Sequence, residues 1–295
     1  MATGIVSVAA ADNGFWGISG PLAVLAAAGL PALMCLAARS WRSFDLSNID
    51  VVVGLFTFVA ACTVVAARFS QYPPVLWGLG AVGLLAWVIL ALLLLRAMRR
   101  LGLLGLRDRA RGTWELASVA TSGLALVCVA MGHTVWALAF WLVALCGYGV
   151  MTTLVAWRAL GEPAVRRDVP PDHWILMGAL AIATLAGEHI YVLLGRGPLA
   201  TAVRVMTLLT LSVAAVQILP LAITSWRQIL DWPAVFPLGM FSEATYAMSI
   251  ETGWRFLGTV SLGFFWIAFV AWALVAAVIV RGLLRSRRAP VAGTR

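Results

Sequence analysis

The chain has 295 residues, of which 62% are hydrophobic and 11% charged, and its mean hydropathy is +0.97. Soluble globular domains are about 45–50% apolar and about 25% charged, so these values exclude a soluble domain. The composition predicts an all-α integral membrane protein, surrounded by the lipid bilayer. The basic residues behind the net charge of +9 then indicate the membrane topology and contact anionic headgroups. We do not expect nucleic-acid binding.

Ten apolar stretches predict ten transmembrane helices within a single membrane domain, 1–295. In chain order these stretches are approximately 1–11, 18–38, 51–67, 74–97, 114–132, 134–157, 172–194, 199–224, 231–249 and 256–282. All but the first approach or exceed the roughly 20 residues that cross about 30 Å of hydrocarbon. The first would extend only about 16 Å as a helix, so we expect a half-helix or a start upstream of Met1. The short links between stretches predict five helical hairpins.

The arginines predict the orientation of these hairpins. All 21 basic residues are Arg. Four lie in or beside the links that lead from an odd to an even span: Arg68, Arg196, Arg204 and Arg255. The remaining 17 lie in the other links and the C-terminal tail. By the positive-inside rule, we expect a multi-pass protein of the plasma membrane with both termini cytoplasmic.

Odd and even spans differ in the size of their side chains. Odd spans carry rows of small residues, which permit close helix packing: Thr3, Ser7 and Ala11; Ser118 and Ser122; Ala179, Ala183 and Gly187. Spans 4 and 10 instead carry a Leu90–Leu95 run and a Phe264–Trp266 cluster, which suit lipid. We therefore expect an inner ring of odd helices around a central pore, with the even helices outside.

The ninth span contains two prolines, an aromatic ring and a carboxyl group. Pro237 has no N–H for a helical hydrogen bond, so the helix should bend beside Phe236. Phe236, Met240 and Glu243 share one helical face, because they are spaced by four and three residues. This pattern indicates a constriction in a pathway, with Phe236 as its gate. The alternative is a packing Phe beside a proline.

Glu243 lies about 18 Å along the ninth span, near mid-membrane. An ionised carboxylate there is costly, so it must pair, face water or stay protonated. We expect a pore-lining or coupling role, or else a hydrogen bond between helices. Glu188 and His189 lie about 25 Å along the seventh span, toward the outer mouth. His189 could titrate at physiological pH, and the alternative is an interfacial pair without a transport role.

A tight anion site built on a buried cation is disfavoured, because the chain has no Lys and no Arg in the middle of an odd span. Hydroxyl groups and helix-end dipoles would instead supply partial positive charge. The candidate pore-lining hydroxyls are Thr3, Ser7, Thr57, Ser118 and Thr121. The four cysteines lie in apolar stretches without paired spacing, so we expect no disulfide framework, no metal site and no cofactor.

Four motifs resemble the tellurite-resistance/C4-dicarboxylate transporter family, whose superfamily includes plant slow anion channels and fungal malate and sulfite transporters. They are Met1–Val8, Trp114–Thr121, Trp174–Gly187 and Val235–Met240. The resemblance implies ten helices in five hairpins, a pore lined by the odd helices, a homotrimer with one pore per subunit, and a gating phenylalanine, here Phe236. Ser122, also a candidate pore residue, stands where relatives often carry Gln, which weakens any transfer of substrate preference.

The leading functional hypothesis is a channel or transporter for small anions, namely malate-like dicarboxylates, sulfite, chloride, nitrate or tellurite-type oxyanions. An alternative is the membrane anchor subunit of a quinone-linked oxidoreductase, which would be expected to present paired histidines for haem or a quinone site. Only His133 and His189 could serve. An intramembrane hydrolase would need paired acids, a Ser/Lys pair or a metal site within the helices. The chain has a single candidate acid, Glu243, and no Lys, so we do not expect an enzyme.

Overall fold

The structure is a computed structural model that describes residues 1–161, 170–225 and 232–288. Four of the arginines counted above lie outside the described residues, as does residue 231 at the expected start of the ninth span: Arg166, Arg167, Arg227 and Arg295.

The described part of the chain is helical and contains no strand. Its α-helices are α1 (Ala2–Asp12), α2 (Trp16–Arg39), α3 (Ile49–Arg68), α4 (Pro73–Arg109), α5 (Leu116–Ala130), α6 (Thr134–Gly161), α8 (Trp174–Leu194), α9 (Pro198–Ser225), α10 (Trp232–Thr252) and α11 (Arg255–Arg288). Three short 3-10 turns precede α3, α5 and α8: η1 (Trp41–Ser43), η2 (Gly112–Glu115) and η3 (Pro171–His173).

Eight of the described helices are long and apolar enough to cross a membrane. The two others are α1, which is apolar but has 11 residues, and α10, which has 21 residues and includes Glu243. With these two, the ten helices correspond in order to the ten predicted spans. The all-α membrane fold is therefore confirmed.

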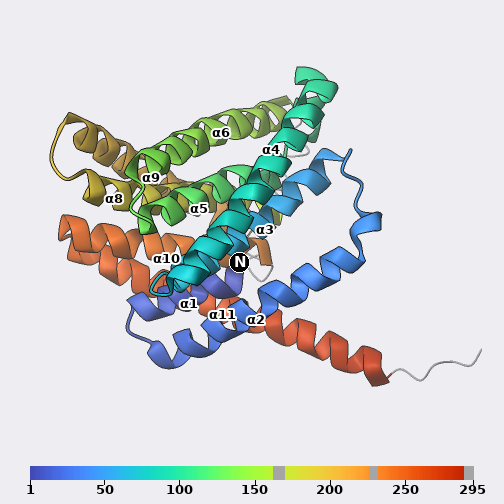
Figure 1. The fold of residues 1–295 in the computed structure, drawn as a ribbon, viewed down its shortest axis with the longest axis horizontal. Coiled ribbons are helices and arrows are strands. Elements are labelled where there is room, and N and C mark those ends of the chain that lie inside the picture. The colour runs from blue at the N-terminus through green and yellow to red at the C-terminus, as the bar shows by residue number, and fades with distance from the viewer. Residues whose placement is uncertain (162–169, 226–231, 289–295) are drawn as a thin grey trace, which may run out of the picture.

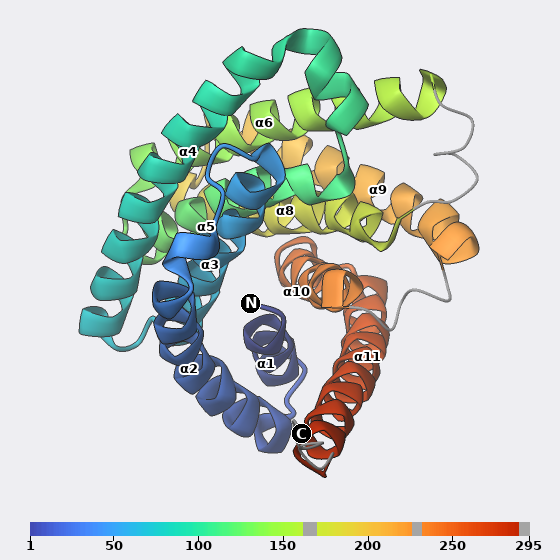
Figure 2. The same ribbon diagram turned by 90° about the vertical axis from the view of Figure 1, so that its right-hand side faces the viewer.

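Consecutive helices pack as five hairpins, as predicted: α1 with α2, α3 with α4, α5 with α6, α8 with α9, and α10 with α11. The first helix of each hairpin also contacts the first helices of its neighbours, so α1, α3, α5, α8 and α10 close a ring. Figure 2 shows the other five helices outside this ring. We call the two sets the inner and outer helices.

Burial separates the two sets clearly. In the most apolar 18-residue window of α3, α5 and α8, between 61% and 83% of residues are buried. In the same window of the outer helices only 17% to 28% are buried, and large side chains such as Leu92, Leu95 and Trp266 are exposed. Since a bilayer solvates apolar side chains, exposed Leu and Trp on a membrane helix indicate a lipid-facing surface. The expected inner and outer rings are confirmed.

The fourth helix differs from its prediction. The expected span ended at residue 97, whereas α4 extends to Arg109 and changes direction at Gly102, whose φ is 64°. Glycine has no Cβ to clash in this left-handed conformation, so it permits the bend inside a helical segment. The residues after Gly102 lead back to η2 at the start of α5 (Figure 1).

Candidate functional site at the carboxyl ends of the inner helices

A cavity of about 570 Å³ opens at the end of the bundle where the inner helices finish. It forms because α1, α3 and α5 end at Asp12, Arg68 and Ala130, while α8 and α10 continue beside it. All five inner helices line it. We call this cavity the vestibule; its polar lining residues are Asp12, Ser70, Glu188, His189, Glu243, Tyr246 and Glu251.

Close packing on both sides fixes α10 against its inner neighbours. Gly178 of α8 faces Pro237, and a Cβ at position 178 would lie 2.9 Å from the Cγ of that proline. Gly239 faces Ile5 of α1, and a Cβ there would lie 2.9 Å from Cγ2 of Ile5. The proline is accommodated inside a continuous helix, α10, between these contacts. Two glycines thus hold the helix that carries Phe236 and Glu243.

The three residues predicted on one face of α10 lie at different depths. Glu243 lines the vestibule and is 5% exposed. Met240 and Phe236 do not line it, and they are 1% and 2% exposed. Phe236 is about 10 Å deeper along the helix axis than Glu243, since each residue advances a helix by 1.5 Å. The open space therefore stops at a layer of buried apolar side chains.

The candidate hydroxyl groups do not all face the same way. Thr3 accepts a hydrogen bond of 3.0 Å from the indole N–H of Trp272 on α11. Ser118 donates to the carbonyl oxygen of Ala144 on α6 at 2.9 Å, and Thr121 accepts from the indole of Trp87 on α4 at 2.8 Å. These three hydroxyls are engaged with outer helices, so we leave them out of the proposed pathway.

Ser7, Ser122 and Thr57 are placed differently. Ser7 and Ser19 each donate to the other's carbonyl oxygen at 2.8 Å, which ties α1 to α2. The Ser122 hydroxyl is fully buried and has no hydrogen-bond partner among the described residues. Thr57 is half-buried on α3. Ser122 and Thr57 remain candidates for the pathway, together with Ser7 near the vestibule.

The vestibule brings together charged residues that the sequence analysis did not connect. The side chains of Asp12 and Glu243 lie within hydrogen-bonding reach of each other. Arg68 donates to the hydroxyls of Ser7 and Ser19 at 3.2 Å and 2.9 Å. Each of Asp12 and Arg68 is the last residue of an inner helix, and the ends of the inner helices converge. That position was the signal in the sequence that could have identified them.

Glu188 and His189 both line the vestibule, but their surroundings differ. Glu188 is 4% exposed, and its Oε1 has no hydrogen-bond partner among the described residues. His189 is exposed and its Nδ1 lies 2.9 Å from the carbonyl oxygen of Leu185, so that nitrogen carries a proton. Nearby, Arg204 forms a 2.8 Å ion pair with Glu251 and stacks on Tyr191.

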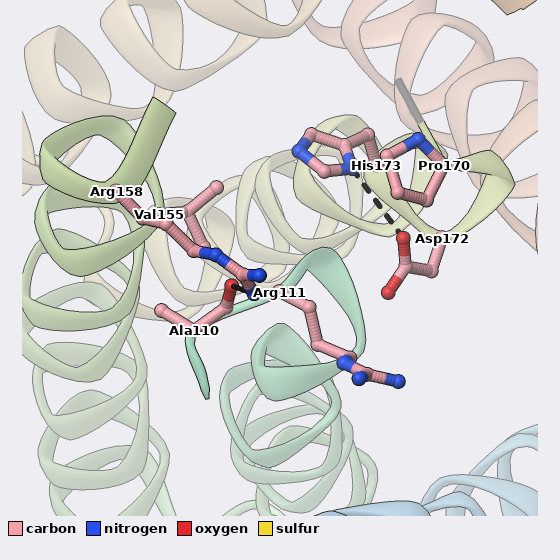
Figure 3. A pocket seen from close by; sticks show the side chains of 7 residues that line it. All are labelled: Ala110, Arg111, Val155, Arg158, Pro170, Asp172 and His173. Atoms are coloured by element: carbon pink, nitrogen blue, oxygen red, sulfur yellow. Dashed lines mark hydrogen bonds and ion pairs between the residues drawn. The ribbon is translucent and has the colours of Figure 1, made fainter. Parts of the chain in front are cut away.

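A second, smaller pocket of about 240 Å³ lies at the opposite end of the bundle (Figure 3). Arg158 donates to the carbonyl oxygen of Ala110 at 3.1 Å, and Asp172 accepts from the backbone N–H of Thr113 at 3.2 Å. His173 lies 3.4 Å from the same carboxylate. These contacts join the link before α5 to α6 and to η3, so we interpret this pocket as structural.

Comparison with known proteins identifies the class to which this helical ring belongs. Residues 1–280 match the voltage-dependent anion channel family. The chain belongs to this family. Its members are anion channels and transporters, so the resemblance found in the sequence is confirmed at the level of the superfamily.

Two relatives of this anion-channel family member come from Mycobacterium tuberculosis, strains CDC 1551 and H37Rv, and both are described as uncharacterized membrane proteins. Each is 31% identical to this chain, over an alignment that covers 42% of this chain and 74% of the relative. Their descriptions support the conclusion that this chain is a membrane protein, and they name no substrate.

Proposed function

We propose that the protein passes small anions across the plasma membrane along the axis of the inner helices, and that Phe236 closes this pathway. The observation that carries the proposal is the position of Phe236. It lies on the α10 face that reaches the vestibule at Glu243, about 10 Å deeper along the helix axis, and its side chain is buried. A bulky apolar ring at such a position can exclude water and ions until it moves.

The proposed substrates are small inorganic anions or C4-dicarboxylates. Conduction needs binding that is strong enough to admit an anion and weak enough to release it. The unpartnered hydroxyl of Ser122 and the half-buried Thr57 are suited to weak binding, because they offer neutral donors in place of a charge. The guanidinium of Arg68 is held by Ser7 and Ser19 beside the vestibule, which Ala67 and Ser70 line, so we place its charge near one end of the pathway.

Purified protein in proteoliposomes tests this proposal. A panel of chloride, nitrate, sulfite, malate and tellurite should give flux for at least one anion above that of protein-free vesicles. Potassium under the same gradient should not move. Cation flux in the absence of anion flux would contradict the proposal.

We expect both termini to be cytoplasmic and the vestibule to open to the exterior, because 17 of the 21 arginines lie in the other links and the tail. Reporter fusions that are active on only one side of the membrane measure this directly. A C-terminal fusion should report the cytoplasm, and a fusion in the link between α10 and α11 should report the exterior. The reverse result would overturn the orientation.

We also propose a homotrimer with one pathway per subunit, on the basis of the family resemblance. Native mass spectrometry of the protein in detergent should give three times the 31.5 kDa mass of one chain. A monomer active in flux assays would show that each pathway functions without the assembly.

A further inference from the structure

The vestibule of this proposed anion pathway carries an excess of negative charge. Its lining includes four carboxyl groups, on Asp12, Glu188, Glu243 and Glu251. Arg204 pairs with Glu251, and Arg68 is engaged with two serine hydroxyls. Among the described residues, no carboxylate forms a salt bridge with Arg68. If every carboxyl group were ionised, an anion entering the vestibule would therefore meet net repulsion.

Two of these carboxyl groups are in direct contact. Asp12 at the end of α1 and Glu243 on α10 line the same cavity, and their side chains lie within hydrogen-bonding reach of each other. Ionised carboxylates only accept hydrogen bonds, so a bond between two carboxyl groups requires a proton on one of them. Two carboxyl groups at this separation therefore offer a place where one proton can be shared.

Two further carboxylate oxygens in the vestibule would be stabilised by a proton. Oε1 of Glu243 and Oε1 of Glu188 have no hydrogen-bond partner among the described residues, although both side chains are at least 95% buried and line the vestibule. An unpartnered, buried carboxylate oxygen is costly unless it gains a proton or another donor. The described residues include no group of three or more side chains that could hold a metal ion.

Two other charged or titratable groups lie near this pair, Arg68 from α3 and His189 from α8. Glu188 from α8 and Tyr246 and Glu251 from α10 line the same vestibule, and Arg204 from the outer helix α9 pairs with Glu251. No described residue of α11 lines the vestibule. Of the four carboxyl groups that line the vestibule, Asp12 and Glu243 are the two whose side chains lie within hydrogen-bonding reach of each other.

We propose that Asp12 and Glu243 form a proton-binding site in the vestibule, and that proton binding there admits an anion to the pathway. The inference rests on the proposed anion transport. Protonation removes negative charge from the vestibule without moving a helix, since the two carboxyl groups already lie together. Anion flux should therefore rise as the pH on the vestibule side falls.

Flux in proteoliposomes, with internal pH fixed and the membrane potential held at zero, tests the site. Lowering the pH on the vestibule side from about 8 to about 5 should raise wild-type flux roughly tenfold or more. Because a single proton binds, the rise should not exceed about tenfold per pH unit. Glu243→Gln mimics the protonated carboxyl group and should give high flux with little pH dependence. Asp12→Asn should displace the curve to lower pH, because an amide can donate to an ionised Glu243 without sharing a proton.

Two control variants separate this site from other titrating groups. Glu115 is fully buried, accepts a 2.7 Å hydrogen bond from Thr152 and does not line the vestibule, so Glu115→Gln should keep the wild-type pH curve. His189→Gln should also keep a pH-dependent flux. If pH dependence disappears in His189→Gln and persists in Glu243→Gln, the histidine is the titrating group and the proposal is wrong.

Infrared difference spectroscopy provides a second measurement that does not depend on transport. Acidification of the wild-type protein should produce the carbonyl band of a protonated carboxylic acid, and this band should be lost in Glu243→Gln. Wild-type protein without flux at any pH would overturn the proposed function, while the infrared band would still decide the proton site. A Glu243→Gln variant with the wild-type band and pH curve would overturn the proton site alone.

Discussion

Phe236→Ala is expected to increase anion flux several-fold or more while the protein stays folded. Phe236 is 2% exposed and lies about 10 Å beyond Glu243, where the vestibule stops. If Phe236 is the gate, removing the ring opens the apolar layer beyond the vestibule, so water and anions can cross it. A phenylalanine that serves only packing would instead cost about 3–5 kcal/mol of stability on truncation and leave flux unchanged.

Phe241→Ala is the matched control for this experiment. Phe241 is on the same helix and is 3% exposed, but its ring packs edge-on against Phe264 of the outer helix α11, with 4.7 Å between ring centroids. Truncation there should lower the melting temperature without raising flux. Equal flux from both variants would mean that any cavity in α10 causes leakage, and Phe236 would lose its proposed role as the gate.

Gly112→Val is expected to destabilise the fold by about 3 kcal/mol or more, because overpacking costs most where the neighbour cannot move. A Cβ at position 112 would overlap the carbonyl group of Asp172 and approach the Cα of His173. These are backbone atoms of η3, held by the hydrogen bonds from Thr113 to Asp172. The side chain can fit only if η2 separates from η3. Thermal unfolding in detergent and the yield of folded protein measure the effect.

Gly147→Ala supplies the comparison. No atom would lie within 4 Å of a Cβ at position 147, which is inside α6. Alanine favours a helix over glycine by up to about 1 kcal/mol, so this variant should be as stable as the wild type or slightly more stable. If both variants unfold at the same temperature, the contact between η2 and η3 is not tight.

The hydrophobic pattern was sufficient to predict the fold. Runs of apolar residues fixed the order of ten helices, and rows of small residues distinguished α1, α5 and α8 from the outer helices. The reason is physical, since lipid-facing helices need large apolar side chains and central helices need small ones. The same reasoning was less reliable for single residues. Phe265 was expected to face lipid, but it is fully buried and stacks on Phe15 with 5.2 Å between ring centroids.

The candidate site was predictable only in part. Helical periodicity placed Glu243 on one face with Phe236, and the length of α8 placed Glu188 and His189 near one end. Periodicity cannot say which face of an inner helix meets an outer one, so Ser118 and Thr121 were grouped with the pore although their hydroxyls bond to α6 and α4. The contact between Asp12 and Glu243 joins residues that are far apart in the sequence, and it depends on the close approach of α1 and α10 at Gly239.

Thiol modification within the vestibule tests most directly whether anions travel along the axis of the inner helices. In a background without the four native cysteines, Ala247→Cys would place a thiol on the vestibule wall, and Val135→Cys would place one at the exposed start of α6, outside the vestibule. A water-soluble thiol reagent should label both sites, as mass spectrometry would show. Labelling at Ala247→Cys should block anion flux, and labelling at Val135→Cys should not. Full flux through protein labelled at Ala247→Cys would contradict a pathway through the inner ring.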